Sequence, residues 1–224
     1  MNNSFLSLPD DKRTSIINAA LRVFSQYGYK KSHINEIAAE AGISKSLLFY
    51  YFKNKKELYL YLLQYCAEIK SQRIKEQGCY DSENFFDVFT HSLKTITDML
   101  RSYPECVIFE LKAYYDNEPE VKADVSDFIN SYSRFAYQTT NISITPDQFI
   151  EGLDLEMIYR NIYLACEGYL FEKISNGSLN ADDMGDWLYL KLMLCNIGIF
   201  IRAALGDRSG LDKLLDKLFY DYND

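Results

Sequence analysis

Apolar residues recur at helical spacing along almost the whole chain, and no segment alternates apolar and polar residues as a half-buried strand does. Only 4 of the 224 residues are Pro and 10 are Gly, so long helices meet few interruptions. The sequence predicts three short helices before residue 55 and a long one over residues 55–76. Further helices are predicted over about 85–100, 107–115, 121–140, 147–174, 182–205 and 211–222. This pattern predicts an all-α fold.

The cysteine and histidine positions argue against a metal centre. The two histidines, His33 and His91, have no neighbour at a metal-ligand spacing, and no two cysteines form a CxxC pair. We therefore expect no metal, no cofactor and no disulfide framework. No apolar run reaches the length of a bilayer span, and the N-terminal residues lack a signal-peptide pattern, so we expect a cytoplasmic protein without a membrane partner. The cysteines are Cys66, Cys79, Cys106, Cys166 and Cys195.

The formal charge of −8 argues at first against nucleic acid, but the charge is unevenly distributed. Residues 1–60 hold nine Lys or Arg and five Asp or Glu, a net charge of +4, and the remaining residues carry −12. A basic segment joined to an acidic one is typical of a module that binds a polyanion. The alternative, that two helices merely expose Lys faces, stays open on charge alone.

Residues 34–58 have the layout of a helix-turn-helix. Two predicted helices are joined by residues 41–44, where Gly42 permits the positive φ of a sharp turn and Ser44 is a helix N-cap residue. In such a motif the second helix enters the DNA major groove with its N-terminus first. We expect Lys45, Ser46 and Leu47 to meet base edges. Residues expected to face the interior are Ile43, Leu48, Tyr51 and Phe52.

This segment resembles the DNA-binding domain of TetR-family transcriptional regulators. The close resemblance covers about residues 10–60 and implies a three-helix DNA-binding domain over residues 1–54. It also implies a larger helical domain for ligand binding and dimerisation over residues 55–224, with residues 55–76 as the connecting helix. The matching residues are Ala19, Ala20, Phe24, Gly28 and Tyr29 upstream, then Gly42, Ile43, Ser44, Lys45, Leu48, Tyr51, Phe52, Lys53, Lys55, Glu57 and Leu58.

The resemblance also implies which residues touch DNA. Lys55 matches a phosphate-anchoring Lys, and Phe49 replaces a Tyr whose hydroxyl commonly touches phosphate. Leu47 replaces a usual Thr and would offer an apolar contact to a thymine methyl group. His33 stands where the family has a helix-capping Thr or Ser, and Ser32 is the alternative cap. The predicted DNA-binding residues are Asn35, Ser44, Lys45, Ser46, Leu47, Phe49, Tyr50 and Lys55.

In the family the acidic part binds a small molecule and forms a homodimer through its last two long helices, here 147–174 and 182–205. The second of these is apolar on more than one face, as a helix covered by its own domain and a partner would be. Tyr-rich apolar stripes in this part favour an amphipathic or aromatic effector, although such stripes are more often simply core. The candidate effector-lining residues are Phe89, Phe109, Tyr132, Phe135, Tyr159 and Tyr163.

Together these features predict a dimeric, ligand-responsive regulator that binds a palindromic operator in double-stranded DNA and acts as a repressor. Two other classes stay open. A helical adaptor that binds only protein would leave the basic segment without a nucleic-acid partner. An enzyme is less favoured, because the sequence has no GxSxG, no glycine-rich phosphate loop and no histidine-based constellation.

Overall fold

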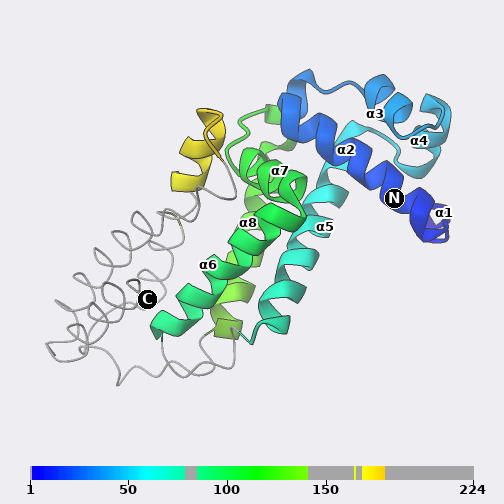
Figure 1. Cartoon of the computed structure of the whole chain (residues 1–224). Coiled ribbons are helices and arrows are strands. Elements are labelled where there is room, and N and C mark those ends of the chain that lie inside the picture. The colour runs from blue at the N-terminus through cyan, green and yellow to red at the C-terminus, as the bar shows by residue number, and fades with distance from the viewer. Residues whose placement is uncertain (1, 79–84, 141–163, 165–167, 180–224) are drawn as a thin grey trace, which may run out of the picture.

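The computed structural model describes residues 2–78, 85–140, 164 and 168–179, and within them every regular element is a helix (Figure 1). The predicted all-α fold is confirmed. None of the helices in this described part is long and apolar enough to cross a bilayer. In chain order they are α1 (Asn3–Leu6), α2 (Asp10–Lys31), α3 (Ile34–Glu40), α4 (Lys45–Tyr51), α5 (Lys55–Glu76), α6 (Phe85–Ser102), α7 (Pro104–Tyr114) and α8 (Pro119–Thr140), followed by a helical stretch over 168–175.

Helices α1 to α4 form a compact head at the upper right of Figure 1. Its longest member, α2, begins after Pro9 and carries two aspartates in its first turn and two lysines in its last. Both placements complement the helix dipole. The helical conformation is interrupted at Gly28, where φ is 71° and ψ is 178°, and α2 continues beyond it to Lys31.

The predicted helix-turn-helix is present as α3 and α4. Gly42 in the turn between them adopts a φ of +68°, which only glycine adopts without strain. The Ser44 hydroxyl accepts a hydrogen bond from the Leu47 backbone N–H at 3.2 Å and caps α4 as predicted. Ile43 is half-buried against the core rather than fully buried.

The capping of α3 differs from both alternatives that the sequence offered. His33 is the N-cap residue, but its side chain makes no capping hydrogen bond. Ser32 does not cap α3 either, because it is buried and its hydroxyl donates to the carbonyls of Val23 and Gly28, at 3.2 and 2.6 Å. The Ser32 hydroxyl therefore ties the connection between α2 and α3 back onto α2.

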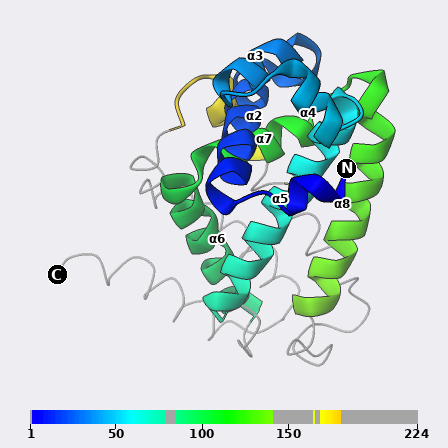
Figure 2. The same ribbon diagram turned by 90° about the vertical axis from the view of Figure 1, so that its right-hand side faces the viewer.

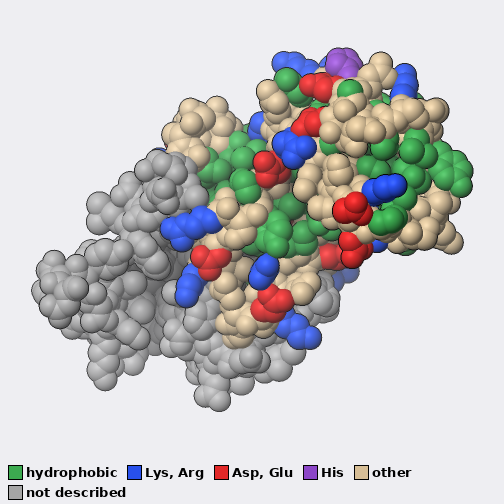
Figure 3. Space-filling model, turned by 45° about the vertical axis from the view of Figure 1, so that its right-hand side comes forward, with side chains coloured by type: hydrophobic (Ala, Val, Ile, Leu, Met, Phe, Trp, Pro, Cys, Tyr) green, Lys and Arg blue, Asp and Glu red, His purple; other side chains and the backbone are tan. Residues whose placement is uncertain are grey.

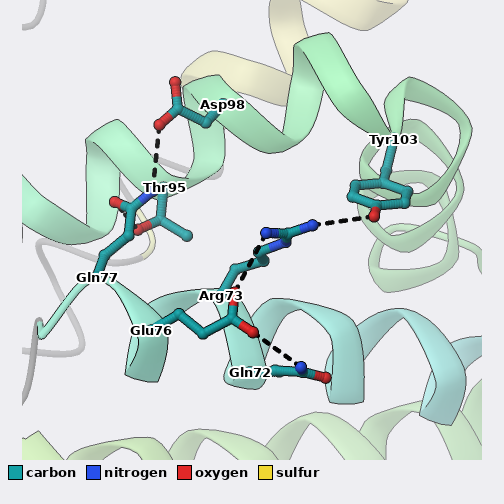
Figure 4. Close-up of polar contacts among 7 residues, drawn as sticks. All are labelled: Gln72, Arg73, Glu76, Gln77, Thr95, Asp98 and Tyr103. Atoms are coloured by element: carbon teal, nitrogen blue, oxygen red, sulfur yellow. Dashed lines mark hydrogen bonds and ion pairs between the residues drawn. The ribbon is translucent and has the colours of Figure 1, made fainter.

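The connecting helix α5 has the predicted bounds. It begins at Asn54, whose side chain accepts from the Glu57 backbone N–H at 2.8 Å, and runs down from the head beside α6, α7 and α8 (Figures 1 and 2). Its lower end is fixed by polar contacts to α6 and to the start of α7 (Figure 4). Gln77 donates to Asp98 at 3.1 Å, and Arg73 donates to the Tyr103 hydroxyl at 3.1 Å.

One hydrophobic core runs from the head into the body, where body means α5 to α8. Leu62 and Leu63 of α5, Phe109 of α7 and Val121 of α8 belong to the same buried cluster as the head residues Ile37 and Leu48. The predicted boundary at residues 54 and 55 coincides with the N-cap of α5, while the core crosses it without a gap. A shared core makes the orientation of the head depend on the packing of the body.

Several predictions lie outside the described residues. They include the two helices expected to form the dimer, except for the final turns of the first, and the terminal helix at 211–222. The described part of that first helix is helical over 168–175, one residue beyond the predicted end at 174, and is followed by a turn at Asn176 and Gly177. Tyr159 and Tyr163 also lie outside the described part. Phe89 and Phe135 lie on α6 and α8, but their side chains are outside it.

Candidate nucleic-acid interface

The second helix of the helix-turn-helix, α4, presents two sharply different faces. Its inner face carries Leu48 and Tyr51, and these side chains together with Phe52 are buried in the core as predicted. With only seven residues, α4 is too short to be stable in isolation, so this packing holds it in place. The inner face therefore fixes the direction of the outer one.

The outer face of α4 exposes most of the predicted DNA-binding residues. Ser44, Lys45 and Ser46 are exposed at its N-terminal end, and Phe49 and Tyr50 follow with exposed fractions of 38% and 59%. The Lys45 ammonium lies 5.8 Å from the centre of the Phe49 ring, one helical turn away. In Figure 3 hydrophobic side chains gather at the end of the head that α1 and α4 form. Such a face offers both hydrogen-bond donors and apolar contacts to a groove.

Two further predicted residues frame this face. Asn35 is exposed on the first turn of α3. Leu47 is half-buried and packs partly against the core, so only part of its side chain is available to a base. The position of Leu47 therefore allows it to support α4 as well as to contact a thymine methyl group.

Lys55 has a structural role that the sequence did not reveal. Its ammonium donates to the carbonyls of Ser32 and Lys30, at 3.1 and 3.4 Å, and lies 4.3 Å from the centre of the Tyr29 ring. Burial lowers the pKa of the Lys55 ammonium, while the nearby carboxylates Glu120, Glu118 and Asp116 oppose that shift. Lys55 thus joins the start of α5 to the end of α2.

Several other basic residues within residues 1–60 are paired within the protein. Arg22 pairs with Glu40 between α2 and α3, Lys30 with Glu118 at 3.4 Å, and Lys56 with Asp124 at 2.6 Å. Arg13 pairs with Asp10 at 2.6 Å. Asp10 and Glu40 are already counted in the net charge of +4 for residues 1–60, whereas Glu118 and Asp124 lie outside that segment and reduce the positive potential that it offers to a polyanion.

The corner between α7 and α8 holds the head to the body. The Asp116 carboxylate accepts from the Tyr29 backbone N–H at 3.3 Å and from the Tyr59 hydroxyl at 3.4 Å. Burial raises the pKa of the Tyr59 hydroxyl, and the charge of Asp116 adds to the rise, so Tyr59 stays protonated and can donate. Next to it, the Lys112 ammonium donates to the Ser25 carbonyl of α2.

Aromatic side chains complete this junction. Phe109 lies with its ring centre 4.9 Å from that of Tyr59 and 6.1 Å from that of Phe24, and it is 1% exposed. Phe109, predicted as an effector-lining residue, is thus a core residue between head and body. Sequence reasoning missed this junction, because its hydrogen bonds join positions 57 to 87 residues apart. Its residues are Phe24, Tyr29, Tyr59, Phe109, Lys112 and Asp116.

Inside the body, a buried ion pair joins α5 to α7. The Lys70 ammonium lies 2.5 Å from Glu110 Oε1, and the two side chains are 11% and 6% exposed. The Tyr114 hydroxyl also donates to Glu110, and the Tyr132 ring lies 4.7 Å from the Lys70 ammonium. Tyr132, another predicted effector-lining residue, therefore lies against a buried charge, on the side of α8 that faces α5. Within the described residues, no three His, Cys, Asp or Glu side chains are gathered as a metal site.

Comparison with known proteins supports the same reading of the head. The family model described as bacterial regulatory proteins of the tetR family matches residues 16–62, which span α2, α3, α4 and the start of α5. These residues therefore form a TetR-type DNA-binding segment, and the similarity to TetR-family regulators is strongest in the head. The HTH-type transcriptional regulator RutR of Escherichia coli K12 is 41% identical over 58 residues, which cover 26% of this chain and 27% of RutR.

Similarity extends further in two other proteins. The transcriptional activator FasR of Mycolicibacterium smegmatis is 44% identical over 126 residues, 52% of each chain. The structure of Bacillus subtilis FadR in complex with stearoyl-CoA has a TM-score of 0.60 and 20% identity, covering 80% of this chain and 96% of FadR. The match to RutR spans about a quarter of the length of RutR, and the match to FasR spans about half of the length of FasR. The likeness to FadR shows a shared fold.

Proposed function

We propose that this chain is the protomer of a dimeric regulator that binds a palindromic operator and represses transcription until a small molecule releases it. The observation that carries this proposal is the outer face of α4, where Lys45, Ser46 and Tyr50 are exposed on a helix whose other face is buried in the core. A short, rigidly supported helix with such a face is the element that reads the major groove in helix-turn-helix proteins.

Contacts to bases and to phosphates come from different residues. Lys45 is a donor for a guanine edge, and the exposed part of Leu47 suits a thymine methyl group. Asn35 at the start of α3 and Ser44 at the start of α4 are placed for phosphates or bases beside this face. Lys55 acts mainly by holding α5 against the end of α2, because two carbonyls already occupy its ammonium. Its charge adds to the attraction for phosphate in a sequence-independent way.

The dimer follows from the geometry of DNA. Two recognition helices must reach half-sites about 34–36 Å apart, and a two-fold dimer matches a palindrome. We propose that helices 147–174 and 182–205 form that dimer, as in the family. A bound dimer covers the operator and blocks access to it, which is the simplest route to repression.

The effector would act through the junction between head and body. The core and the Asp116 contacts join α2, α5 and α7, so a change in body packing that moves α7 also moves the head. A ligand that prefers one arrangement of α7 would then select one spacing of the two heads. The FadR structure with stearoyl-CoA supports an effector that has a long apolar part, and Tyr132 beside Lys70 is placed to contact a polar group of such a ligand.

The deciding experiment is a binding titration with the DNA upstream of the protein's own gene, at several salt concentrations and without effector. We expect a specific complex whose log affinity falls steeply and linearly with log salt concentration. A folded variant in which Lys45, Ser46 and Tyr50 are all Ala should lose the specific complex and keep the melting temperature. If the folded wild-type dimer forms no complex at low salt, the protein is an adaptor or an enzyme rather than a DNA-binding regulator.

The sign of regulation and the role of the effector need a reporter in cells. Deleting the gene should raise expression from the operator-linked promoter if the protein is a repressor. It should lower expression if the protein is an activator, which is how FasR is described. Stearoyl-CoA and free fatty acids are the first probes for release. The proposed effector class would be supported if either probe releases the protein from the operator while the melting temperature of the DNA duplex stays unchanged.

A further inference from the structure

The short helix α1 lies outside the family match, and sequence reasoning did not predict it. It precedes the matched residues 16–62 and lies beside the C-terminal end of α4 and the first turns of α5 (Figure 2). Its Asn2 side chain caps it by accepting from the Ser4 backbone N–H at 3.2 Å. Arg13 of α2 donates to the Leu6 carbonyl at 3.0 Å and fixes its other end. The helix α1 is therefore a built part of the head.

Asn2 supplies hydrogen bonds that α4 lacks. The last carbonyls of an α-helix have no donor within the helix, and α4 consists of only two turns. The Asn2 backbone N–H donates to the Tyr51 carbonyl at 2.9 Å, and the Asn2 side-chain amide donates to the Tyr50 carbonyl at 3.3 Å. The C-terminal end of α4 is thus capped by a residue from a different part of the chain.

Phe5 fixes α1 against the same end of α4. Its ring is fully buried and lies with its centre 5.6 Å from the Tyr51 ring, 4.7 Å from the Phe52 ring and 5.4 Å from the Tyr61 ring. Tyr51 ends α4, Phe52 is its C-cap residue, and Tyr61 lies on α5. Phe5 therefore joins the end of the recognition helix to the start of the connecting helix.

Two exposed aromatic residues lie next to this contact. Phe49 and Tyr50 lie on the last turn of α4 and are among the large apolar residues that the head exposes. Helix ends fray when their terminal groups are unpaired. A last turn that frays would lose the fixed directions of Phe49 and Tyr50.

We infer that α1 is a positioning element for DNA reading, in which Asn2 and Phe5 hold the last turn of the recognition helix so that Phe49 and Tyr50 meet DNA in one orientation. This inference rests on the proposed DNA-binding function. It assigns no DNA contact to Asn2 or Phe5 themselves. Removing their support lowers affinity for the specific site more than affinity for unrelated DNA, because phosphate attraction does not depend on the orientation of one helical turn.

The test uses the full chain with Phe5→Ala, Asn2→Ala, the conservative variant Phe5→Leu and the matched control Leu6→Ala. Leu6 lies on the same helix and is 50% exposed, so Leu6→Ala should change neither the specific nor the non-specific DNA affinity. We expect Phe5→Ala to weaken specific binding roughly tenfold, the loss of about one base-pair contact, with non-specific binding within about twofold. Phe5→Leu should recover most of the loss. Asn2→Ala, which keeps the whole core, should give a smaller loss of the same kind.

Hydrogen exchange in the free protein separates this inference from the proposed function. Both Phe5→Ala and Asn2→Ala should speed amide exchange at the end of α4, while Leu6→Ala should not. If the wild type binds no specific DNA, the proposed function fails, and the exchange data still decide whether α1 orders α4. The inference is overturned if Asn2→Ala and a folded Phe5→Ala leave both the specific affinity and the exchange rates of α4 at wild-type values. Equal losses for specific and unrelated DNA would also overturn it.

Discussion

The outer face of the head and the buried side of α5 and α7 use polar residues in opposite ways. On the outer face, Asn35, Lys45 and Tyr50 are exposed to solvent. On the buried side, Lys70 of α5 pairs with Glu110 of α7, and the nearby half-buried Asp116, in the corner between α7 and α8, accepts from Tyr59 and from the backbone of α2. The first arrangement allows single side chains to change without disturbing the fold. The second makes each side chain depend on its partners, which suits a junction that transmits a change in packing.

The largest expected effect is loss of one member of the buried ion pair. Glu110→Ala leaves the Lys70 ammonium buried beside two aromatic rings without its carboxylate, and should cost about 3 kcal/mol of unfolding free energy. Urea denaturation measures it. The double variant Lys70→Met with Glu110→Leu should regain most of the loss. Asp10→Ala, which removes the exposed partner of Arg13, is the surface control. Equal losses in the single and double variants would contradict a role for the buried charge.

A smaller but more specific effect is expected at the junction. Asp116→Ala removes the acceptor of the Tyr59 hydroxyl and of the Tyr29 N–H, and should cost about 1–3 kcal/mol, as partly buried donors lose their partner. It should also weaken the coupling between effector and DNA, measured as the ratio of DNA affinities with and without effector. Asn117→Ala, on the exposed neighbouring residue, is the control. An unchanged ratio would show that the signal reaches the head by another route.

On the outer face, substitution of a fully exposed residue should lower DNA affinity and leave the stability of the fold unchanged. Lys45→Ala should cost about 1–3 kcal/mol for the operator and relax preference at one base position. Leu47→Ala should change preference at a different position, with some loss of stability because Leu47 is half-buried. Lys53→Ala, at an exposed site beyond α4, should weaken all sequences alike and reduce the salt slope. A lower melting temperature for Lys45→Ala would contradict the view that outer-face residues affect DNA binding and buried residues affect stability.

The smallest effect is expected in acid, at the surface pair between α5 and α8. The Lys56 ammonium, 2.6 Å from Asp124, lowers the pKa of that carboxyl below its ordinary value of 3.8. The folded state therefore gains stability from this group above the ordinary pKa and loses it as the pH falls through the lowered one. Asp124→Asn should be slightly less stable than wild type at neutral pH, and the difference should vanish in acid. A difference that persists below both pKa values would assign the effect to something other than this ion pair.

The sequence located the helices of the head because their signals are local. Ser44, Gly42 and Asn54 act on residues within four positions of themselves, so the turn and the starts of α4 and α5 are legible in a short window. The inward residues Leu48, Tyr51 and Phe52 follow from helical spacing. The helix α1 was not predicted, because four residues are too few to show a periodic pattern. The cap of α3 was predicted wrongly because the Ser32 hydroxyl donates to a carbonyl of α2 instead.

By itself, the sequence determined the all-α fold, the position of the helix-turn-helix and the residues on its outer face. Those properties depend on spacing along one helix and on turn chemistry. Only the tertiary structure decided that Lys55 is tied to α2, that Phe109 is core between head and body, and that α1 caps the recognition helix. Each of these joins residues more than 20 positions apart, and such pairs form because the buried polar group needs a partner and the apolar ring needs a covered site. Residue order does not say which distant partner will be nearest.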